Sequence, residues 1–208
     1  MSTIPKSTVS APTALPTIAA LKKWMARRRI AISITCFTAL IVFNLTVLDT
    51  PPTSPLKFWI WNSGLGMSLI GLGLAIRSWS AGTLHKYNQL TTIGPYALVR
   101  NPLYLGSFLM MYGFAFIMSD WLSILFIAIP MTLLYYFQVL HEEKHLANTF
   151  PKVWPDYCRS TPRFFPYKLN SHWFSGWSGA QWLRNREYQA ILGAGLGVLG
   201  LIALAAFN

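Results

Sequence analysis

Uncharged apolar stretches recur along the chain, and five of them approach the length that a helix needs to cross a bilayer, about 20 residues. They occupy residues 30–48, 58–76, 102–118, 121–140 and 189–207. Only Ser119 and Asp120 follow the third stretch before the fourth begins, so these two helices should form a tight hairpin. The pattern predicts an all-α, polytopic membrane protein with about five transmembrane helices.

Composition supports a membrane protein over a soluble domain. The 208 residues are 53% hydrophobic and 11% charged, with a mean hydropathy of +0.40, whereas roughly a quarter of the residues in soluble domains are charged. Aromatic residues make up 15% of the chain, and Trp and Tyr are the types that anchor proteins at membrane interfaces. This composition excludes a disordered chain and, with two cysteines, a disulfide-rich scaffold.

The net charge of +11 is explained by membrane topology. Sixteen of the seventeen Lys and Arg residues precede the first stretch, lie between the second and third, or lie between the fourth and fifth, which leaves only Lys57 on the other side. The positive-inside rule therefore predicts a cytoplasmic N-terminus and an outside C-terminus. It predicts membrane lipids and no nucleic acid as partners. Without a cleavable signal peptide, the pattern favours a prokaryotic inner membrane or an endoplasmic-reticulum-like one.

Four regions follow from this organisation. They are a disordered basic tail (1–29), two helices (30–79), a core that holds the hairpin (80–167), and a linker with a fifth helix (168–208). Small residues on one face of a helix allow a close approach of a second helix. This predicts packing faces at Gly64, Ser68, Gly71 and Ala75 in the second helix and at Gly193 and Gly197 in the fifth, where a homodimer contact is an alternative.

Ionisable residues are absent from the interior of the five stretches, which disfavours a transporter or channel. They gather instead in residues 77–100 and 141–186, which flank the hairpin. The sequence therefore predicts a site at the cytoplasmic end of the hairpin.

The first of these segments ends with Arg100 and Asn101, directly before Pro102. Proline is favoured at the first position of a helix, where free backbone N–H groups and the helix dipole attract anions. Arg100 could bind a carboxylate or phosphate there with two hydrogen bonds. The alternative is an interfacial arginine that reaches lipid headgroups.

The second segment places Glu142 and Glu143 at the predicted end of the fourth helix, where cations are preferred. Either nearby basic side chains neutralise them, or they accept hydrogen bonds from the hydroxyls or the amine of a ligand. Spacings of four, four and three then predict an amphipathic helix along the membrane surface, although Pro151 and Pro155 interrupt it. This helix would serve as a lid, as a lipid-tail groove or as an anchor. Its apolar residues are Leu146, Phe150, Trp154 and Tyr157.

Histidines at 141 and 145 have the spacing of two metal ligands on a helix, yet no matching His or Cys pair accompanies them in the sequence. No metal site is predicted.

Together the two segments resemble the isoprenylcysteine carboxyl methyltransferases and the related phospholipid methyltransferases. The resemblance covers residues 80–167. Its first half is Gly94, Tyr96, Arg100, Asn101, Pro102, Tyr104 and Gly106. Its second half is Glu142, Glu143, Leu146, Phe150, Pro151, Trp154, Tyr157, Pro162, Arg163 and Pro166.

The resemblance implies an integral membrane enzyme that transfers a methyl group from S-adenosylmethionine to a lipophilic acceptor entering from the bilayer. It implies a pocket at the cytosolic end of the hairpin, with Arg100 on the methionine carboxylate and with Glu142 and Glu143 on the ribose hydroxyls or the ammonium. The implied cofactor-binding residues are His85, Tyr96, Arg100, Asn101, Pro102, Tyr104, Glu142 and Glu143. The implied catalytic residues are Glu143, Tyr157 and Arg163, the last two facing the acceptor.

Asn101 replaces the histidine of the family pattern, and an amide cannot titrate near neutrality. This favours an acceptor that is already nucleophilic, such as a carboxylate or a thiol. Prenylated cysteine, a phospholipid amine, an isoprenoid and a small thiol all stay open. Two other functions also stay open, because fold does not decide the reaction. They are a nicotinamide-dependent membrane reductase of related fold and a non-catalytic membrane module.

Overall fold

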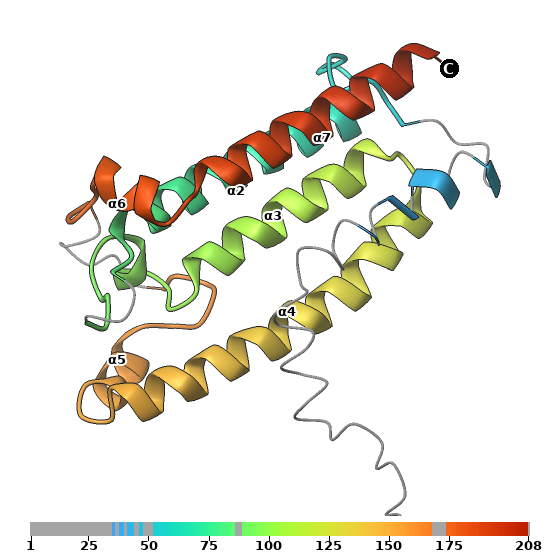
Figure 1. Cartoon of the computed structure of the whole chain (residues 1–208). Helices are drawn as coiled ribbons and strands as arrows, with labels where there is room; N and C mark the ends of the chain where they lie inside the picture. The colour runs from blue at the N-terminus through green and yellow to red at the C-terminus, as the bar shows by residue number, and fades with distance from the viewer. Residues whose placement is uncertain are drawn as a thin grey trace, which may run out of the picture. The chain divides into compact units, whose positions relative to one another are not determined.

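The computed structural model describes residues 52–85, 89–167 and 174–207, with a few positions between 35 and 47. The predicted tail (1–29), most of the first predicted helix (30–48) and residue 208 at the C-terminus lie outside the described residues. Within the described residues every element is helical (Figure 1), as predicted. The elements are α2 (Trp61–Thr83), η2 (Gly94–Ala97), α3 (Pro102–Ile117), α4 (Trp121–Thr149), α5 (Trp154–Ser160), α6 (Gly179–Arg184) and α7 (Tyr188–Phe207).

The hairpin of α3 and α4 is confirmed. Only three residues connect the two helices, and Ser119 takes a left-handed conformation there with φ 67°. Among the described helices, α7 alone is long and apolar enough to cross a membrane, and α3 is a shorter apolar helix. The total of about five transmembrane helices stays a prediction.

Helices α2 and α3 pack closely at two pairs of glycines. A Cβ added to Gly66 would lie 2.6 Å from the carbonyl oxygen of Gly113, and one added to Gly73 would lie 2.5 Å from that of Gly106. The predicted packing face of α2 is therefore not the one that meets α3, because Ser68, Gly71 and Ala75 are exposed. Helix α2 carries small residues on two faces. The sequence pattern alone does not show which of them packs, and it is the face with Gly66 and Gly73 that meets glycines on α3.

Helix α7 joins the core that α2 and α3 form. The buried core residues are Ile70, Ile117, Met118, Ala194 and Leu201. A Cβ at Gly197 would meet the ring of Phe114 at 3.0 Å, whereas one at Gly193 would have no neighbour within 4 Å. One of the two predicted packing glycines therefore packs within the chain, and a homodimer contact through α7 stays a prediction.

The end of α2 is held by side chains from a distant segment. The helix continues seven residues beyond the predicted limit at position 76, and its last carbonyl groups need partners. Asn185 Nδ2 donates to the carbonyl oxygens of Ala81 and Leu84 at 2.7 and 2.9 Å, and Gln181 Nε2 donates to that of Leu84 at 2.5 Å. The segment around α6 therefore caps α2 from about a hundred residues away.

Helix α4 also extends beyond its predicted span, to Thr149. Glu142 and Glu143 therefore lie inside the helix rather than at its end. The helix stops before Pro151, because the residue before a proline avoids the helical conformation. The chain turns there and resumes as α5, with Trp154 and Tyr157 buried. The stretch predicted as an amphipathic helix over residues 146–157 is therefore divided between the end of α4 and α5, with the break at Pro151, whereas Pro155 lies inside α5.

Candidate functional site

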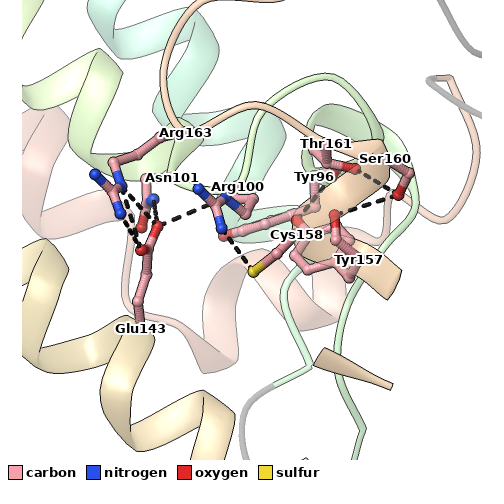
Figure 2. Close-up of polar contacts among 9 residues, drawn as sticks. All are labelled: Tyr96, Arg100, Asn101, Glu143, Tyr157, Cys158, Ser160, Thr161 and Arg163. Atoms are coloured by element: carbon pink, nitrogen blue, oxygen red, sulfur yellow. Dashed lines mark hydrogen bonds and ion pairs between the residues drawn. The ribbon is translucent and has the colours of Figure 1, made fainter. Parts of the chain in front are cut away.

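The two segments that resemble the methyltransferases meet at the carboxylate of Glu143, near the start of α3 (Figure 2). Asn101 Nδ2 donates to Glu143 Oε1 at 2.9 Å, and Arg163 donates from Nη2 to Oε2 at 2.8 Å and from Nε to both oxygens at 3.1 and 3.2 Å. Backbone hydrogen bonds hold the segments together. Arg100 N donates to Pro162 O at 2.8 Å, and Asn101 N donates to Arg163 O at 3.3 Å.

Arg100 approaches the same carboxylate from another side. Its Nε lies 3.6 Å from Glu143 Oε1, its Nη1 donates to Cys158 Sγ at 2.6 Å, and its guanidinium lies 5.9 Å from the ring centre of Trp154. The Nε is buried and has no hydrogen-bond partner among the described residues. The sequence predicted an anion near the start of α3, and the structure places Glu143 there.

The charges of this cluster do not cancel. Glu143 is only 8% exposed and carries one negative charge between two arginines. The hydrogen bonds to Glu143 raise the pKa of Arg163 above its ordinary value, although partial burial opposes this change. Arginine side chains are always protonated in proteins, so the cluster holds two guanidinium groups and one carboxylate. It therefore has one excess positive charge, beside the buried Nε of Arg100 that makes no hydrogen bond within the described residues. Such a position favours an anionic group of a ligand.

Two tyrosines connect α5 to η2. Tyr157 donates a hydrogen bond from its hydroxyl to the carbonyl oxygen of Tyr96 at 2.8 Å. The hydroxyl of Tyr96 is buried and has no hydrogen-bond partner among the described residues. Burial raises the pKa of both phenols well above the ordinary value of 10.0. Both hydroxyls therefore remain protonated donors at physiological pH, and that of Tyr96 is available to a ligand.

Glu142 has a separate contact on α3. The hydroxyl of Tyr104 donates to Glu142 Oε2 at 2.6 Å, and the ring of Tyr104 meets that of Tyr135 edge to face at 5.9 Å between centres. Glu142 is exposed, in contrast to its neighbour Glu143. One oxygen of its carboxylate is therefore held by Tyr104, and no described residue makes a hydrogen bond to the other.

The remaining predicted residues lie at the edges of this arrangement. Pro102 is the first residue of α3 and is buried. His85 lies just after the end of α2, where its ring Nδ1 is 2.9 Å from the carbonyl oxygen of Thr83. Its backbone N–H donates to Thr91 Oγ1 at 3.1 Å. These contacts hold His85 at the end of α2 rather than at Glu143. In the part of the chain that the structure describes, no group of three or more metal-ligating side chains occurs.

Sequence reasoning missed a second charged cluster. Arg77 Nε and Nη2 donate to the two carboxylate oxygens of Glu187 at 2.8 and 3.0 Å, and Nη1 donates to Ser107 Oγ at 2.5 Å. One signal could have found it. The chain has only six acidic residues, and Glu187 directly precedes a long apolar stretch, where an unpaired carboxylate would be costly.

Comparisons with known proteins agree with this arrangement. The phospholipid methyltransferase family model matches residues 61–153, which contain α2, α3, α4 and both glutamates of the hairpin end. The cobalt-zinc-cadmium resistance protein CzcN of Cupriavidus metallidurans is 30% identical over 163 residues, which are 74% of this chain and 73% of that protein. The nickel-cobalt-cadmium resistance protein NccN of Alcaligenes xylosoxydans xylosoxydans is 30% identical over 158 residues, 73% and 72% of the two chains.

No solved structure matches the chain significantly. The family match begins at the first residue of α2 and so takes in the helix that packs on α3, together with the hairpin. The resemblance read from the two polar segments is therefore confirmed at the level of the family. The chain belongs to the phospholipid methyltransferase family, a family associated with membranes.

Proposed function

We propose that this protein is an integral membrane methyltransferase that uses S-adenosylmethionine and acts on a lipophilic acceptor. Family membership supports the reaction class. The observation that carries the proposal is the buried cluster in which Arg100 and Arg163 converge on Glu143. This cluster brings together residues from both halves of the family pattern. It also has an excess positive charge and a buried N–H group, that of Arg100 Nε, without a hydrogen bond in the described protein.

These residues fit the polar groups of the cofactor. The Nε of Arg100, which makes no hydrogen bond within the described residues, and the excess charge suit a carboxylate, so Arg100 would hold the methionine end. The carboxylate of the exposed Glu142 suits a ribose hydroxyl or an ammonium group, both of which donate hydrogen bonds. Asn101, Pro102 and Tyr104 would line the site at the start of α3, with His85 and Tyr96 at its margin.

S-adenosylmethionine would supply a methyl group on a positively charged sulfur, which any aligned nucleophile can attack. The task of the protein is then to orient two partners and to exclude water. The carboxylate of Glu143 forms ion pairs with two arginines, and the protonated hydroxyl of Tyr157 donates a hydrogen bond to a backbone carbonyl group. Neither is suited to remove a proton. This supports an acceptor that needs no base, such as a carboxylate or a thiolate.

The placement in the membrane is part of the proposal. We infer about five crossing helices, with α3 and α4 as the hairpin and α7 as the last. The polar cluster would lie at the cytoplasmic face, in keeping with the Lys and Arg distribution and with a cytoplasmic N-terminus. The acceptor would then reach Arg163 and Tyr157 from the bilayer.

Methyl labelling tests the reaction. Membranes that contain the protein are incubated with methyl-labelled S-adenosylmethionine, and the label is separated into lipid, protein and volatile fractions. Arg100→Ala should abolish the labelling, whereas Arg159→Ala should not, because the side chain of Arg159 is 80% exposed and its ion pair, with Asp156, lies on the surface. No labelling, together with no binding of S-adenosylmethionine by the purified protein, would favour the reductase or the non-catalytic module instead.

The names of the two relatives add a physiological test. Both are named for resistance to cobalt and cadmium together with zinc or nickel. We propose that methyl transfer by this chain supports growth on such metals. A strain that lacks the gene would be complemented with the wild type and with Glu143→Gln. If the variant restores growth although it has lost methyl transfer, the proposed link between the two is wrong.

A further inference from the structure

The guanidinium of Arg100 is held from the side of α5 as well as by Glu143. Its Nη1 donates a hydrogen bond to Cys158 Sγ at 2.6 Å, and its centre lies 5.9 Å from the centre of the Trp154 ring. Figure 2 shows the guanidinium between Glu143 and Cys158, with a contact to each. Within the described residues, this sulfur is the one hydrogen-bond acceptor that the side chain of Arg100 has.

The carboxylate of Glu143 does not serve as that acceptor, because other donors use its oxygens. Asn101 and Arg163 together make four hydrogen-bond contacts with the two oxygens, and an ionised carboxylate has about four acceptor positions. Arg100 Nε lies 3.6 Å from Oε1, which is longer than a hydrogen bond. Glu143 therefore attracts Arg100 through charge alone.

One edge of the Arg100 guanidinium is left unused. Arginine binds a carboxylate with two parallel hydrogen bonds from one edge of the guanidinium. Arg163 binds Glu143 through the edge formed by Nε and Nη2, and Arg77 binds its own carboxylate partner in the same way. In Arg100 these two nitrogens make no hydrogen bond within the described residues, because the contact with Cys158 is made by Nη1. The edge that binds carboxylates in the other two arginines is thus available in Arg100.

A thiol can hold this guanidinium without neutralising it. Sulfur is a weak acceptor, so it orients Nη1 while the positive charge of Arg100 is retained. A carboxylate in the place of Cys158 would cancel that charge, as Glu187 does at Arg77. The contact with sulfur therefore fixes an orientation and preserves the excess charge that favours an anionic group.

Helix α5 does not depend on the thiol for its own position. Tyr157, on the same helix, donates from its hydroxyl to the carbonyl oxygen of Tyr96 at 2.8 Å, and Trp154 is buried. Just after the helix, Pro162 O accepts a hydrogen bond from Arg100 N at 2.8 Å. The thiol itself is only partly buried. Its contact should therefore affect the side chain of Arg100 far more than it affects the fold.

We infer that Cys158 is a positioning residue, whose sulfur holds Nη1 of Arg100 so that Nε and Nη2 together bind the carboxylate of the cofactor. This inference rests on the proposed function, because the carboxylate in question belongs to the methionine end of S-adenosylmethionine. Trp154 supports the same orientation through its ring. The side chain of Arg100 is 13% exposed, so a ligand can contact it.

Cys158→Ala tests this role with two probes on the full-length protein in detergent. S-adenosylhomocysteine carries the amino acid carboxylate, and methylthioadenosine lacks it. The variant should bind S-adenosylhomocysteine about fivefold more weakly, which corresponds to the loss of one ordinary hydrogen bond. It should bind methylthioadenosine as the wild type does, and its thermal unfolding midpoint should not change. A residue needed only for the fold would weaken both ligands.

Three further variants are controls. Cys158→Ser keeps an acceptor at the same position, so it should retain most of the affinity for S-adenosylhomocysteine. Ser160→Ala removes a hydroxyl of the same helix that donates to the carbonyl oxygen of Tyr157 at 3.2 Å rather than to Arg100, so it should change neither affinity. Arg100→Ala should weaken S-adenosylhomocysteine alone, and more strongly than Cys158→Ala does.

A Cys158→Ala variant that binds S-adenosylhomocysteine like the wild type, or that weakens both probes equally, would overturn the inference. So would a Cys158→Ser variant that loses as much affinity as Cys158→Ala, because the effect would then not come from the acceptor. Failure of the wild type itself to bind S-adenosylhomocysteine would contradict the proposed function instead.

Discussion

Asn101 and Glu143 lie 42 residues apart in the chain and are joined by a hydrogen bond of 2.9 Å between the amide nitrogen and Oε1. The bond connects the start of α3 with the late turns of α4, and Arg163 completes it from a third segment. One carboxylate therefore holds together the parts that the family pattern keeps in separate motifs. Glu143 is in the first place an organiser of the site, and the next prediction tests this role.

Glu143→Gln should destabilise the fold far more than Glu142→Gln. The first variant leaves Arg100 and Arg163 without their common counter-charge, and breaking a buried ion pair costs about 3–5 kcal/mol. We expect the lower end of this range, because the side chain of Arg163 is 34% exposed. Glu142 is exposed and a glutamine can still accept from Tyr104, so that variant should change stability by less than about 1 kcal/mol. Unfolding in detergent measures both, and equal effects would contradict this view of Glu143.

Arg163→Lys should make the protein sensitive to alkaline pH. Pairing with Glu143 raises the pKa of Arg163, so the wild-type guanidinium stays charged across the alkaline range. A lysine, with an ordinary pKa of about 10.4, also gains from the pair. Its contribution is complete below that value and is lost as the pH rises through the elevated pKa of the folded state. Thermal midpoints between pH 8 and 11 should fall more steeply for the variant, and parallel curves would contradict the prediction.

Tyr157→Phe should reduce the alkaline sensitivity that the wild type does have. Burial raises the pKa of Tyr157 above 10.0 in the folded state. The unfolded chain therefore ionises first, and stability that is present below pH 10 is lost as the pH rises above it. The variant removes this loss, but it also leaves the carbonyl group of Tyr96 unpaired, at a cost of about 1–3 kcal/mol at neutral pH. Unfolding curves at pH 7 and 11 measure both effects.

Gly73→Ala and Gly71→Ala should change stability in opposite directions. A Cβ at Gly73 would meet Gly106 O at 2.5 Å and Met110 Cγ at 2.7 Å, so the helices α2 and α3 would have to separate. At Gly71 nothing lies within 4 Å, and alanine is favoured over glycine in a helix by about 1 kcal/mol. Thermal midpoints in detergent distinguish the two. Similar midpoints would show that the close glycine contact is not essential.

The sequence predicted the helices and the location of the site because both depend on local patterns. Apolar length located α3, α4 and α7 to within a residue at the start of each helix. Arg100, Asn101 and Glu143 were placed in one site because polar residues flank the hairpin on the same side. The helix ends were less predictable. The apolar pattern predicts an end of α2 before Arg77, since an isolated charge ends an apolar stretch, but the helix continues, and Glu187 pairs with this charge.

Partners that are distant in the chain could not be read from spacing. Whether Gly66 or Gly71 faces α3 depends on how α2 is rotated, and both belong to stripes of small residues. Likewise Arg163 rather than Arg100 makes the two-pronged contact with a carboxylate, and that carboxylate belongs to the chain itself. Such choices depend on three-dimensional geometry, which one sequence does not contain.

The capping of α2 by the segment around α6 sets an order of events during biosynthesis. The carbonyl groups of Ala81 and Leu84 and the charge of Arg77 find partners 97–110 residues later in the chain. At ~5–20 residues per second, a ribosome reaches those partners roughly 5–20 s after it has made α2. Until then the end of α2 depends on water or on assisting proteins. The newborn chain therefore acquires the hairpin first, and the end of α2 gains its partners only after residue 187 has emerged.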